Sequence, residues 1–316
     1  MNEKIPLVSV SCCTFNHAPY IRQCLEGFVQ QKTEFEFEVL VHDDASNDGT
    51  VEIIREFEKK YPQIIKPVYE VENQYSKHDG SISRIQRKRA LGKYFAYCEG
   101  DDYWTDKYKL QKQIDFLEKH PDYGMYYGKA RNFVQKSGKF KNVFGTDFFT
   151  FENLINENTI PTLTVVVRKD LLECYYNEIK PEDKKWRMGD YPQWLWFSKN
   201  SKVKFFPNVF GVYRILQKSA SHTNVVEETI AFEKSYYDIK RFFANHYGYN
   251  NSLVPPFDEH KVRAYFYMHL GMGKIAAKEF LQVKNRTRKI RFLSFFCSHF
   301  LLFCALYSYY RIRYGW

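Results

Sequence analysis

The chain has 316 residues, and its 44% hydrophobic and 27% charged residues are typical of globular proteins, which excludes a disordered chain. This length is enough for one large domain or a core domain with an appendage. The formal net charge is +10, but residues 284–316 hold seven basic and no acidic residues, so the rest of the chain is nearly balanced and nucleic acid is not an expected partner.

Strand-like and helix-like patterns alternate through the first 120 residues. Residues 8–13 form a β-rich run, and residues 21–29 then carry apolar side chains at i, i+3, i+4, i+7 and i+8. The pattern continues with strands at 37–41, 64–69 and 94–98 and a helix at 51–61. This order predicts an α/β fold with a Rossmann-like, doubly wound, mostly parallel sheet flanked by helices.

The second half is less regular. The patterns predict helices at 109–119 and 193–197, two strands within 203–214, and amphipathic helices at 227–247 and 259–283, and residues 162–168 form a β-branched run. We expect a catalytic domain over 1–225, with a nucleotide-binding half (1–120) and an acceptor half (121–225). Residues 226–316 are expected to form a helical C-terminal extension.

Three predicted strands are followed by polar segments: Thr14-Phe15-Asn16, Asp43-Asp44 and Glu99-Gly100-Asp101-Asp102. The carboxyl ends of parallel strands meet at one edge of a sheet, where ligands bind. An aromatic ring can stack on a base, and carboxylates can accept hydrogen bonds from a nucleoside or hold Mg²⁺ or Mn²⁺ against a diphosphate. The three segments together therefore predict a site for a nucleotide diphosphate and a metal ion.

Each segment also has a purely structural explanation. Asp43-Asp44 can cap a turn, and an aspartate before a helix is a common N-cap. No GxxxxGK[ST] loop is present and no GxGxxG loop follows the first strand, which argues against a P-loop ATPase and a dinucleotide dehydrogenase.

The ordered set of motifs from Val8 to Asn16, from Val39 to Thr50 and from Gly92 to Trp104 resembles the inverting family 2 glycosyltransferases with the GT-A fold, over about residues 5–222. The resemblance implies transfer of a sugar from a nucleotide-diphosphate donor to an acceptor hydroxyl. It also implies that Thr14, Phe15 and Asp44 hold the nucleoside.

By the same resemblance, Glu99-Gly100-Asp101-Asp102 is the motif for ribose and a divalent metal, Mn²⁺ or Mg²⁺. Asn16, Glu99 and Asp101 complete the expected donor site, and either Asp101 or Asp102 is the direct metal ligand. Two residues depart from the common pattern: Cys13 stands where many relatives have Pro or Thr, and Glu99 stands where many have Asp.

The acceptor side and the closing segment have candidates of their own. Met188-Gly189-Asp190 resembles the acidic acceptor-side motif, so Asp190 is the expected general base, and a helix N-cap is the alternative role. Arg214 and His222 resemble the segment that closes over the donor. Arg214 would neutralise the diphosphate and His222 would bind the metal or a phosphate, or both are ordinary loop residues.

The basic tail suggests a membrane surface. Residues 292–310 form a largely apolar stretch that as one helix would be about 28 Å long, a marginal length for a span. Basic residues flank this stretch and aromatic residues crowd its end, which favours attachment of residues 284–316 to an anionic membrane surface. Packing on the catalytic domain or on a partner subunit is the alternative.

The seven cysteines contain no CxxC pair, and no apolar leader precedes the first strand, so we expect a cytoplasmic protein, peripheral on the cytoplasmic face of the membrane. The leading hypothesis is a metal-dependent inverting glycosyltransferase of cell-surface polysaccharide synthesis, using a UDP-sugar and a glycan or lipid-linked acceptor. The alternatives are a sugar nucleotidyltransferase and a catalytically silent glycan- or membrane-binding subunit.

Overall fold

The computed structural model describes residues 5–148, 150–216, 225–250 and 252–314. The chain divides into two compact units, Met1–Ile215 and Leu216–Trp316. The first unit contains the sheet and the second is helical, which confirms the predicted fold class.

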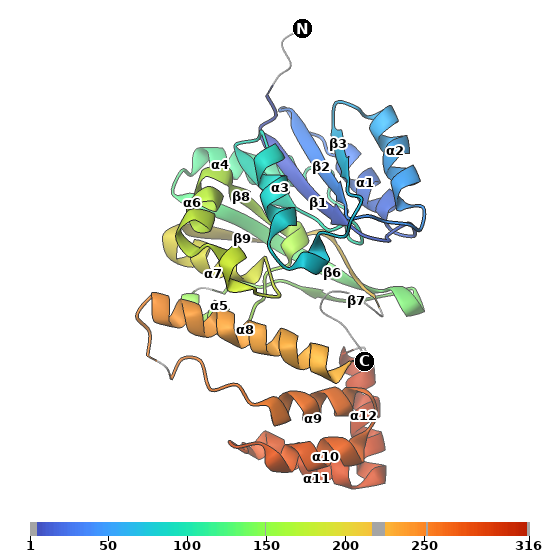
Figure 1. Ribbon diagram of the computed structural model, residues 1–316, viewed down its shortest axis with the longest axis vertical. Helices are drawn as coiled ribbons and strands as arrows, with labels where there is room; N and C mark the ends of the chain where they lie inside the picture. Colours follow the sequence, from blue (N-terminus) through green and yellow to red (C-terminus); the bar gives the residue numbers. More distant parts are fainter. Residues whose placement is uncertain (1–4, 149, 217–224, 251, 315–316) are drawn as a thin grey trace. The chain divides into compact units, whose positions relative to one another are not determined.

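The described residues of the first unit form a nine-stranded sheet of order β3-β2-β1-β4-β8-β6-β9-β5, with β7 paired to β6 (Figure 1). Strands β3, β2, β1 and β4 are mutually parallel, and beyond β4 the sheet is mixed. The strand bounds are β1 Val8–Thr14, β2 Phe37–Asp43, β3 Ile65–Tyr69, β4 Tyr94–Tyr97, β5 Tyr103–Trp104, β6 Tyr123–Val134, β7 Lys139–Phe144, β8 Val166–Arg168 and β9 Lys202–Ile215.

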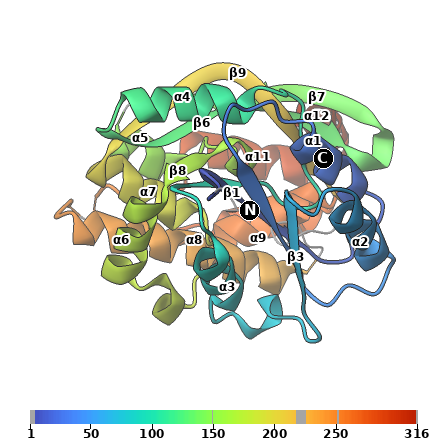
Figure 2. The ribbon, with the colours of Figure 1, turned by 90° about the horizontal axis from the view of Figure 1, so that it is seen from above.

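Helices cover both faces of this sheet. The helix bounds are α1 Ile21–Val29, α2 Thr50–Lys60, α3 Ser81–Arg89, α4 Lys109–Lys119, α5 Phe151–Asn156, α6 Lys169–Ile179 and α7 Tyr191–Asn200. Alternate residues of β1, among them Val8 and Val10, pack with the apolar sides of α1 and α4 in one core. On the other face, Gln86 of α3 donates to the carbonyl of Leu40 (2.6 Å). Figure 2 shows α3 and α4 on opposite sides of the sheet.

Two predicted elements of the chain are wrong in detail. The two strands predicted within 203–214 are one strand, β9, because this segment pairs along its length with β6 and at its end with β5. The single helix predicted over 259–283 is two helices, α9 Glu259–His269 and α10 Gly273–Gln282. Gly271 separates them with a φ of +78°, a left-handed conformation that glycine adopts without strain.

The second unit consists of α8 Val226–His246, α9, α10, α11 Arg288–Ser298 and α12 Phe300–Tyr314. Apolar side chains of α9 to α12 form one core, which includes Met268, Phe280 and Leu293. The stretch 292–310, treated above as one helix, is broken at His299, where the chain bends by 118° between the two helices. Within the described part of the chain, no single helix is both long and apolar enough to cross a bilayer, and only this bent pair meets the length and composition test.

A fully buried lysine lies in the core of the first unit. The Lys109 ammonium donates to Oε1 of Gln113 (2.8 Å) and lies 4.0 Å from the ring centroid of Trp104. Burial lowers the pKa of Lys109 to about 7, although the nearby Cys98 and Asp106 oppose this shift. Between pH 7 and about 10.5, the unfolded chain therefore binds more protons at this group than the folded chain.

Replacing this lysine with an apolar side chain should change how stability depends on pH. The free energy of unfolding of the wild type, minus that of Lys109→Met, should rise by about 3 kcal/mol between pH 7 and pH 10. Over this range the lysine loses its proton in the folded chain but keeps it in the unfolded chain, so each rise in pH favours the folded wild type. Urea unfolding at several pH values measures the difference. Lys119→Met, an exposed lysine of the same helix, is the control and should show no such trend; a flat difference for Lys109→Met would contradict the prediction.

Candidate active site

The carboxyl ends of β1, β2 and β4 lie side by side at one edge of the sheet. Thr14 is in register with Asp43, and the N–H of Asp44 donates to the Thr14 carbonyl (2.9 Å). The N–H of Gly100 donates to the carbonyl of Cys13 (2.9 Å). The three polar segments are therefore direct neighbours through backbone hydrogen bonds.

The loop after β1 combines a buried hydroxyl with an exposed ring. Thr14 is 3% exposed and its Oγ1 has no hydrogen-bond partner, whereas Phe15 is 44% exposed. A Cβ on Gly100 would lie 2.6 Å from the Thr14 hydroxyl, so only glycine permits this approach. Asn16 has a φ of +53°, and its side-chain oxygen accepts the N–H of Asn47 (2.9 Å). Asn16 thus fastens this loop, and Phe15 faces solvent.

Asp44 is buried, and its carboxylate holds a second loop. Its two oxygens accept the N–H groups of Gln74 (2.6 Å) and Tyr75 (3.0 Å). Nε2 of the buried His42 lies 3.7 Å from the same carboxylate, and neither nitrogen of this ring has a hydrogen-bond partner. Asp44 therefore lies at the expected edge of the sheet, but both of its oxygens already bind the protein backbone.

Three carboxylates beyond β4 are electrostatically linked. The Glu99 side chain keeps an exposed face, yet the protein packed around it, followed by the negative charges of Asp101 and Asp190, raises the pKa of Glu99 to about 7. Asp101 is half-buried. The segment after β4 and the predicted general base, which are about 90 residues apart in the sequence, therefore share one electrostatic environment.

Asp102 differs sharply from its neighbour Asp101. Asp102 is 2% exposed, and its Oδ1 accepts the backbone N–H of Arg214 (2.8 Å), which ties the segment after β4 to β9. Burial raises the pKa of Asp102, and Arg214 partly opposes this shift. The Arg214 guanidinium is itself buried, donates to Gln23 and lies 4.7 Å from the ring centroid of Tyr103. His222 lies outside the described residues.

Asp190 begins α7 and is held by both of its oxygens. One accepts the backbone N–H of the following residue (2.7 Å), and the other accepts the hydroxyl of Thr162 (2.5 Å). Gln193, one turn further along, donates to the carbonyl of Gly189 (2.6 Å) and accepts the hydroxyl of Tyr97 (2.6 Å). Asp190 is thus an N-cap, and its carboxylate also belongs to the acidic group beyond β4.

The segment before Asp190 is braced by ion pairs. Nη2 of Arg87 lies 3.4 Å from Glu182, and Nη1 of Arg84 lies 3.3 Å from the same carboxylate. Arg87 also contacts Glu173 (2.5 Å), and its guanidinium lies 3.4 Å from the ring centroid of Tyr176. These contacts join α3 to the helices that precede Asp190.

Sequence reasoning missed Thr162, Gln193 and the Gln74-Tyr75 backbone. Thr162 contacts Asp190 across 28 positions, the Gln74 backbone contacts Asp44 across 30, and Gln193 joins the segment of Asp190 to Tyr97 across 96. The available signals were weak: a threonine in a β-branched run, and an Asn-Gln pair that is typical of a turn.

The described residues contain no group of three or more His, Cys, Asp or Glu side chains arranged to hold a metal by themselves. Oxygen atoms of Asp101 and Glu99 suit a hard divalent cation, and the acids that raise the pKa of Glu99 create a negative potential that favours one. A cation bound there would need further ligands from a substrate or from water.

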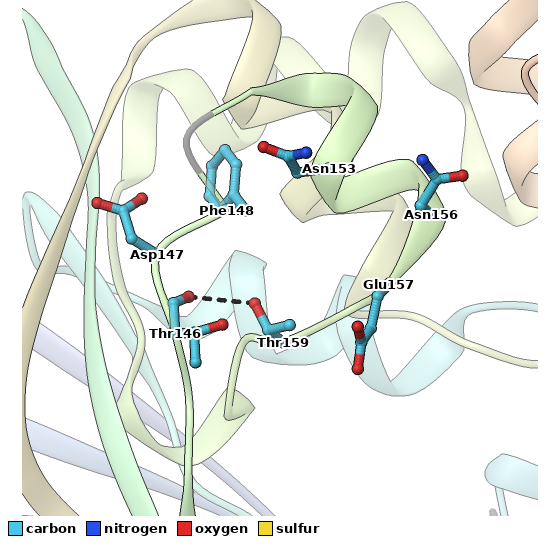
Figure 3. Close-up of a pocket in the computed structure, with 7 residues that line it drawn as sticks. All are labelled: Thr146, Asp147, Phe148, Asn153, Asn156, Glu157 and Thr159. Atoms are coloured by element: carbon cyan, nitrogen blue, oxygen red, sulfur yellow. Dashed lines mark hydrogen bonds between the residues drawn. The ribbon is translucent and has the colours of Figure 1, made fainter.

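A polar hollow of about 350 Å³ lies between the end of β7 and α5 (Figure 3). Its wall includes the amides of Asn153 and Asn156, the Glu157 carboxylate and the Phe148 ring. Tyr191, which follows Asp190, donates to backbone carbonyls of α5, so the helix lining the hollow packs on the helix that begins at Asp190.

Two curated relatives match half of the chain or more. An uncharacterized protein of Mycobacterium tuberculosis is 36% identical over 165 residues, which are 51% of this chain and 47% of that protein. The glucosyltransferase WfgD of Escherichia coli, named for UDP-Glc and a GlcNAc-diphosphoundecaprenol acceptor, is 26% identical over 70% of this chain and 82% of its own length. The chain spans about half the length of the first of these relatives.

Solved structures share the fold at low identity. The mannosyltransferase PcManGT of Pyrobaculum calidifontis, solved with GDP-Man and Mn²⁺, has a TM-score of 0.55 at 15% identity and covers 96% of this chain and 87% of its own. S. aureus TarS 1-349 with UDP-GlcNAc has a TM-score of 0.53 at 17% identity, covering 96% and 91%. These likenesses confirm the GT-A-like fold. The protein-family model described as "Glycosyl transferase family 2" matches residues 9–175, which are more than half of the chain. The chain therefore belongs to that family.

Proposed function

We propose that the chain is a metal-dependent inverting glycosyltransferase that moves a sugar from a nucleotide-diphosphate donor, with UDP the first candidate, to a hydroxyl of a glycan or lipid-linked acceptor in cell-surface polysaccharide synthesis. The observation that carries this proposal is that the polar segments after β1, β2 and β4 are joined by backbone hydrogen bonds at one edge of the sheet, in a chain of family 2. The charges of Asp101 and Asp190 both act on Glu99 at this edge. The donor and acceptor in the name of WfgD support the proposed substrate classes.

The donor nucleotide would lie at the ends of β1 and β2. Phe15 offers an exposed ring for the base, and Thr14 offers a hydroxyl that has no partner within the protein. Asp44 and Asn16 would act mainly by fixing the loops around the nucleoside, because their side-chain oxygens already accept backbone N–H groups. Arg214 would support the site through Asp102, since its guanidinium is buried.

Asp101, with Glu99 beside it, would hold Mn²⁺ or Mg²⁺ together with the donor diphosphate. The buried Asp102 is better suited to anchor β9, and His222 remains a proposed further ligand. When bound, the metal would stabilise the negative charge that develops on the leaving diphosphate.

Asp190 would act as the general base. In a single displacement, the acceptor hydroxyl attacks the anomeric carbon on the side opposite the leaving diphosphate, and its proton passes to a carboxylate on that side. The hydrogen bonds from Thr162 and from the first N–H of α7 fix this carboxylate, and both of its oxygens retain lone pairs for a proton. The polar hollow of Figure 3 is lined by α5, to which Tyr191 donates its hydroxyl hydrogen bonds, and is a candidate place for more distant parts of the acceptor.

Removing the base should separate donor binding from transfer. Asp190→Asn keeps an N-cap, so the fold and the affinity for the donor should be preserved, while sugar transfer should fall about 10²- to 10⁴-fold. Calorimetry with UDP and a turnover assay with a screened UDP-sugar measure the two effects. Asp183→Asn, an exposed aspartate of the same segment, is the control. Transfer by Asp190→Asn at more than a tenth of the wild-type rate would exclude this role.

Replacing each of the two adjacent aspartates with alanine should remove a different property of the protein. Asp101→Ala should bind UDP equally with and without Mn²⁺ and keep its melting temperature. Asp102→Ala should lose about 1–3 kcal/mol of stability, because the N–H of Arg214 loses its buried acceptor. Thermal unfolding and UDP titration with and without Mn²⁺ provide the comparison. If Asp102→Ala keeps its stability but binds UDP equally with and without Mn²⁺, the assignment of metal binding to Asp101 and of a structural role to Asp102 is wrong.

The same titration separates the alternative functions. A silent subunit would bind no UDP in either condition. A sugar nucleotidyltransferase would release pyrophosphate from a nucleoside triphosphate and a sugar phosphate, whereas a glycosyltransferase releases a nucleoside diphosphate from the donor.

We propose that the chain attaches peripherally to the cytoplasmic face of a membrane through residues 284–316. The inner side of α11 packs in the core of the second unit, so the lipid-facing part would be the bend at His299. There Phe295, Phe300 and Leu301 are 53%, 73% and 81% exposed. The described basic side chains of residues 284–291 are also exposed, and they complement an anionic lipid surface.

Reducing the apolar character of the bend should weaken membrane binding. Full-length Phe300→Ser/Leu301→Ser should bind vesicles of mixed phosphatidylglycerol and phosphatidylcholine about tenfold less than the wild type, because two exposed apolar side chains no longer enter the interface. Sedimentation with vesicles measures this, and Ile5→Ser/Leu91→Ser, two exposed apolar residues of the first unit, is the control. Equal binding by both variants and the wild type, or binding that ignores lipid charge, would count against the attachment.

A further inference from the structure

A second exposed aromatic ring belongs to the same loop system as Phe15. Tyr75 is 49% exposed, and its N–H donates to Oδ2 of Asp44 (3.0 Å). Phe15 directly follows Thr14, whose carbonyl accepts the N–H of Asp44 (2.9 Å). Tyr75 itself contacts Asp44, and Phe15 is the neighbour of a residue that does. Both rings therefore start from backbone close to Asp44, the residue at the centre of the expected nucleoside site.

The Tyr75 backbone is held in a tight turn. Asn73 accepts the N–H of Ser76 (2.8 Å) through its side-chain oxygen and donates to the carbonyl of Asp44 (3.3 Å). The N–H of His78 donates to the carbonyl of Tyr75 (3.1 Å), and the two rings are 5.6 Å apart in an edge-on arrangement. Because the turn is fixed before any ligand binds, ordering this side chain costs a ligand little.

The electrostatics of Tyr75 also link it to the segment before Asp190. Burial of its hydroxyl raises the pKa of Tyr75, and the positive charge of Arg187 opposes this shift. Arg187 lies three positions before Asp190. The tyrosine hydroxyl is therefore close enough to the segment before the proposed base to respond to its charge, while the ring keeps about half of its surface open to solvent.

The state of Asp44 decides what these rings can contribute. This residue is only 3% exposed, so a nucleobase can reach little of its carboxylate, although each of the two oxygens accepts a single backbone N–H group. Aromatic faces bind bases without such bonds. The unpartnered Thr14 Oγ1 and Asp43 Oδ1 add polar atoms to the same strand ends.

We infer that Tyr75 is a second aromatic residue of the nucleobase site, which acts with Phe15 to bind the base of a nucleoside diphosphate by contact with its ring face. This inference rests on the proposed function, because it requires a nucleotide at the ends of β1 and β2. It gives the segment 73–78 a direct role in donor binding and makes the Asp44 carboxylate the group that places Tyr75.

Calorimetric titration of the full chain with UDP in the presence of Mn²⁺ tests this inference without any turnover. Tyr75→Leu and Phe15→Leu should each bind UDP roughly 5- to 100-fold more weakly. Tyr75→Phe, which keeps the ring, should stay within about twofold of the wild type. Pyrophosphate has no base, so its affinity for Tyr75→Leu should be unchanged. Tyr108→Leu, another exposed aromatic residue, is the control, and thermal unfolding verifies that each variant is folded.

The outcomes separate the two proposals. If the wild type binds UDP and Tyr75→Leu binds it equally well, or loses UDP and pyrophosphate affinity in parallel, the role of Tyr75 is wrong and the proposed function stands. If the wild type binds neither UDP nor GDP with Mn²⁺, both the proposed function and the role of Tyr75 are overturned.

Discussion

The parallel pairing of β1 with β2 and β4 is the constraint on which the candidate site depends. It places three strand ends at one edge, and the hydrogen bonds from Asp44 to Thr14 and from Gly100 to Cys13 continue the pairing into the loops. The close contact of Gly100 with Thr14 leaves no room for a side chain between two of these segments. The positions of Phe15, Asp44 and Glu99 are thus fixed by the backbone.

This arrangement divides similar acidic residues into different tasks. Asp44 and Asp102 are buried and accept backbone N–H groups, so they stabilise the loops and β9. Glu99 and Asp101 are less buried, and together with Asp190 they concentrate negative charge where a cation would offset both their charge and that of a bound diphosphate. Neighbouring carboxylates in one motif therefore differ in role because their hydrogen-bond partners differ.

Local patterns in the sequence predicted the parallel part of the fold well, because each strand there is a short apolar run and each helix has one apolar side. The same reasoning split β9 in two, since Pro207 and Asn208 interrupt its pattern and only the distant β6 and β5 complete it. It joined α9 to α10 across Gly271, where a single left-handed residue ends a helix that periodicity alone would continue. At the site, residue types could be predicted, but the partners of Asp44 and Asp190 could not, because those contacts join distant segments.

The proposed nucleotide side of the site and its proposed acceptor side also differ in how their geometry is maintained. On the nucleotide side, backbone hydrogen bonds of the sheet and its loops fix the positions, and these bonds do not depend on side-chain identity. On the acceptor side, Asp190 is placed by side chains: Thr162 bonds to it directly, Gln193 and Tyr97 hold the segment beside it, and the Arg87–Glu182 pair braces the chain before it. Backbone geometry survives most substitutions, whereas a side-chain network changes with each member. Within one fold, the proposed acceptor side is therefore the part that can change most readily with sequence, while the geometry of the sheet edge beyond β1, β2 and β4 is retained.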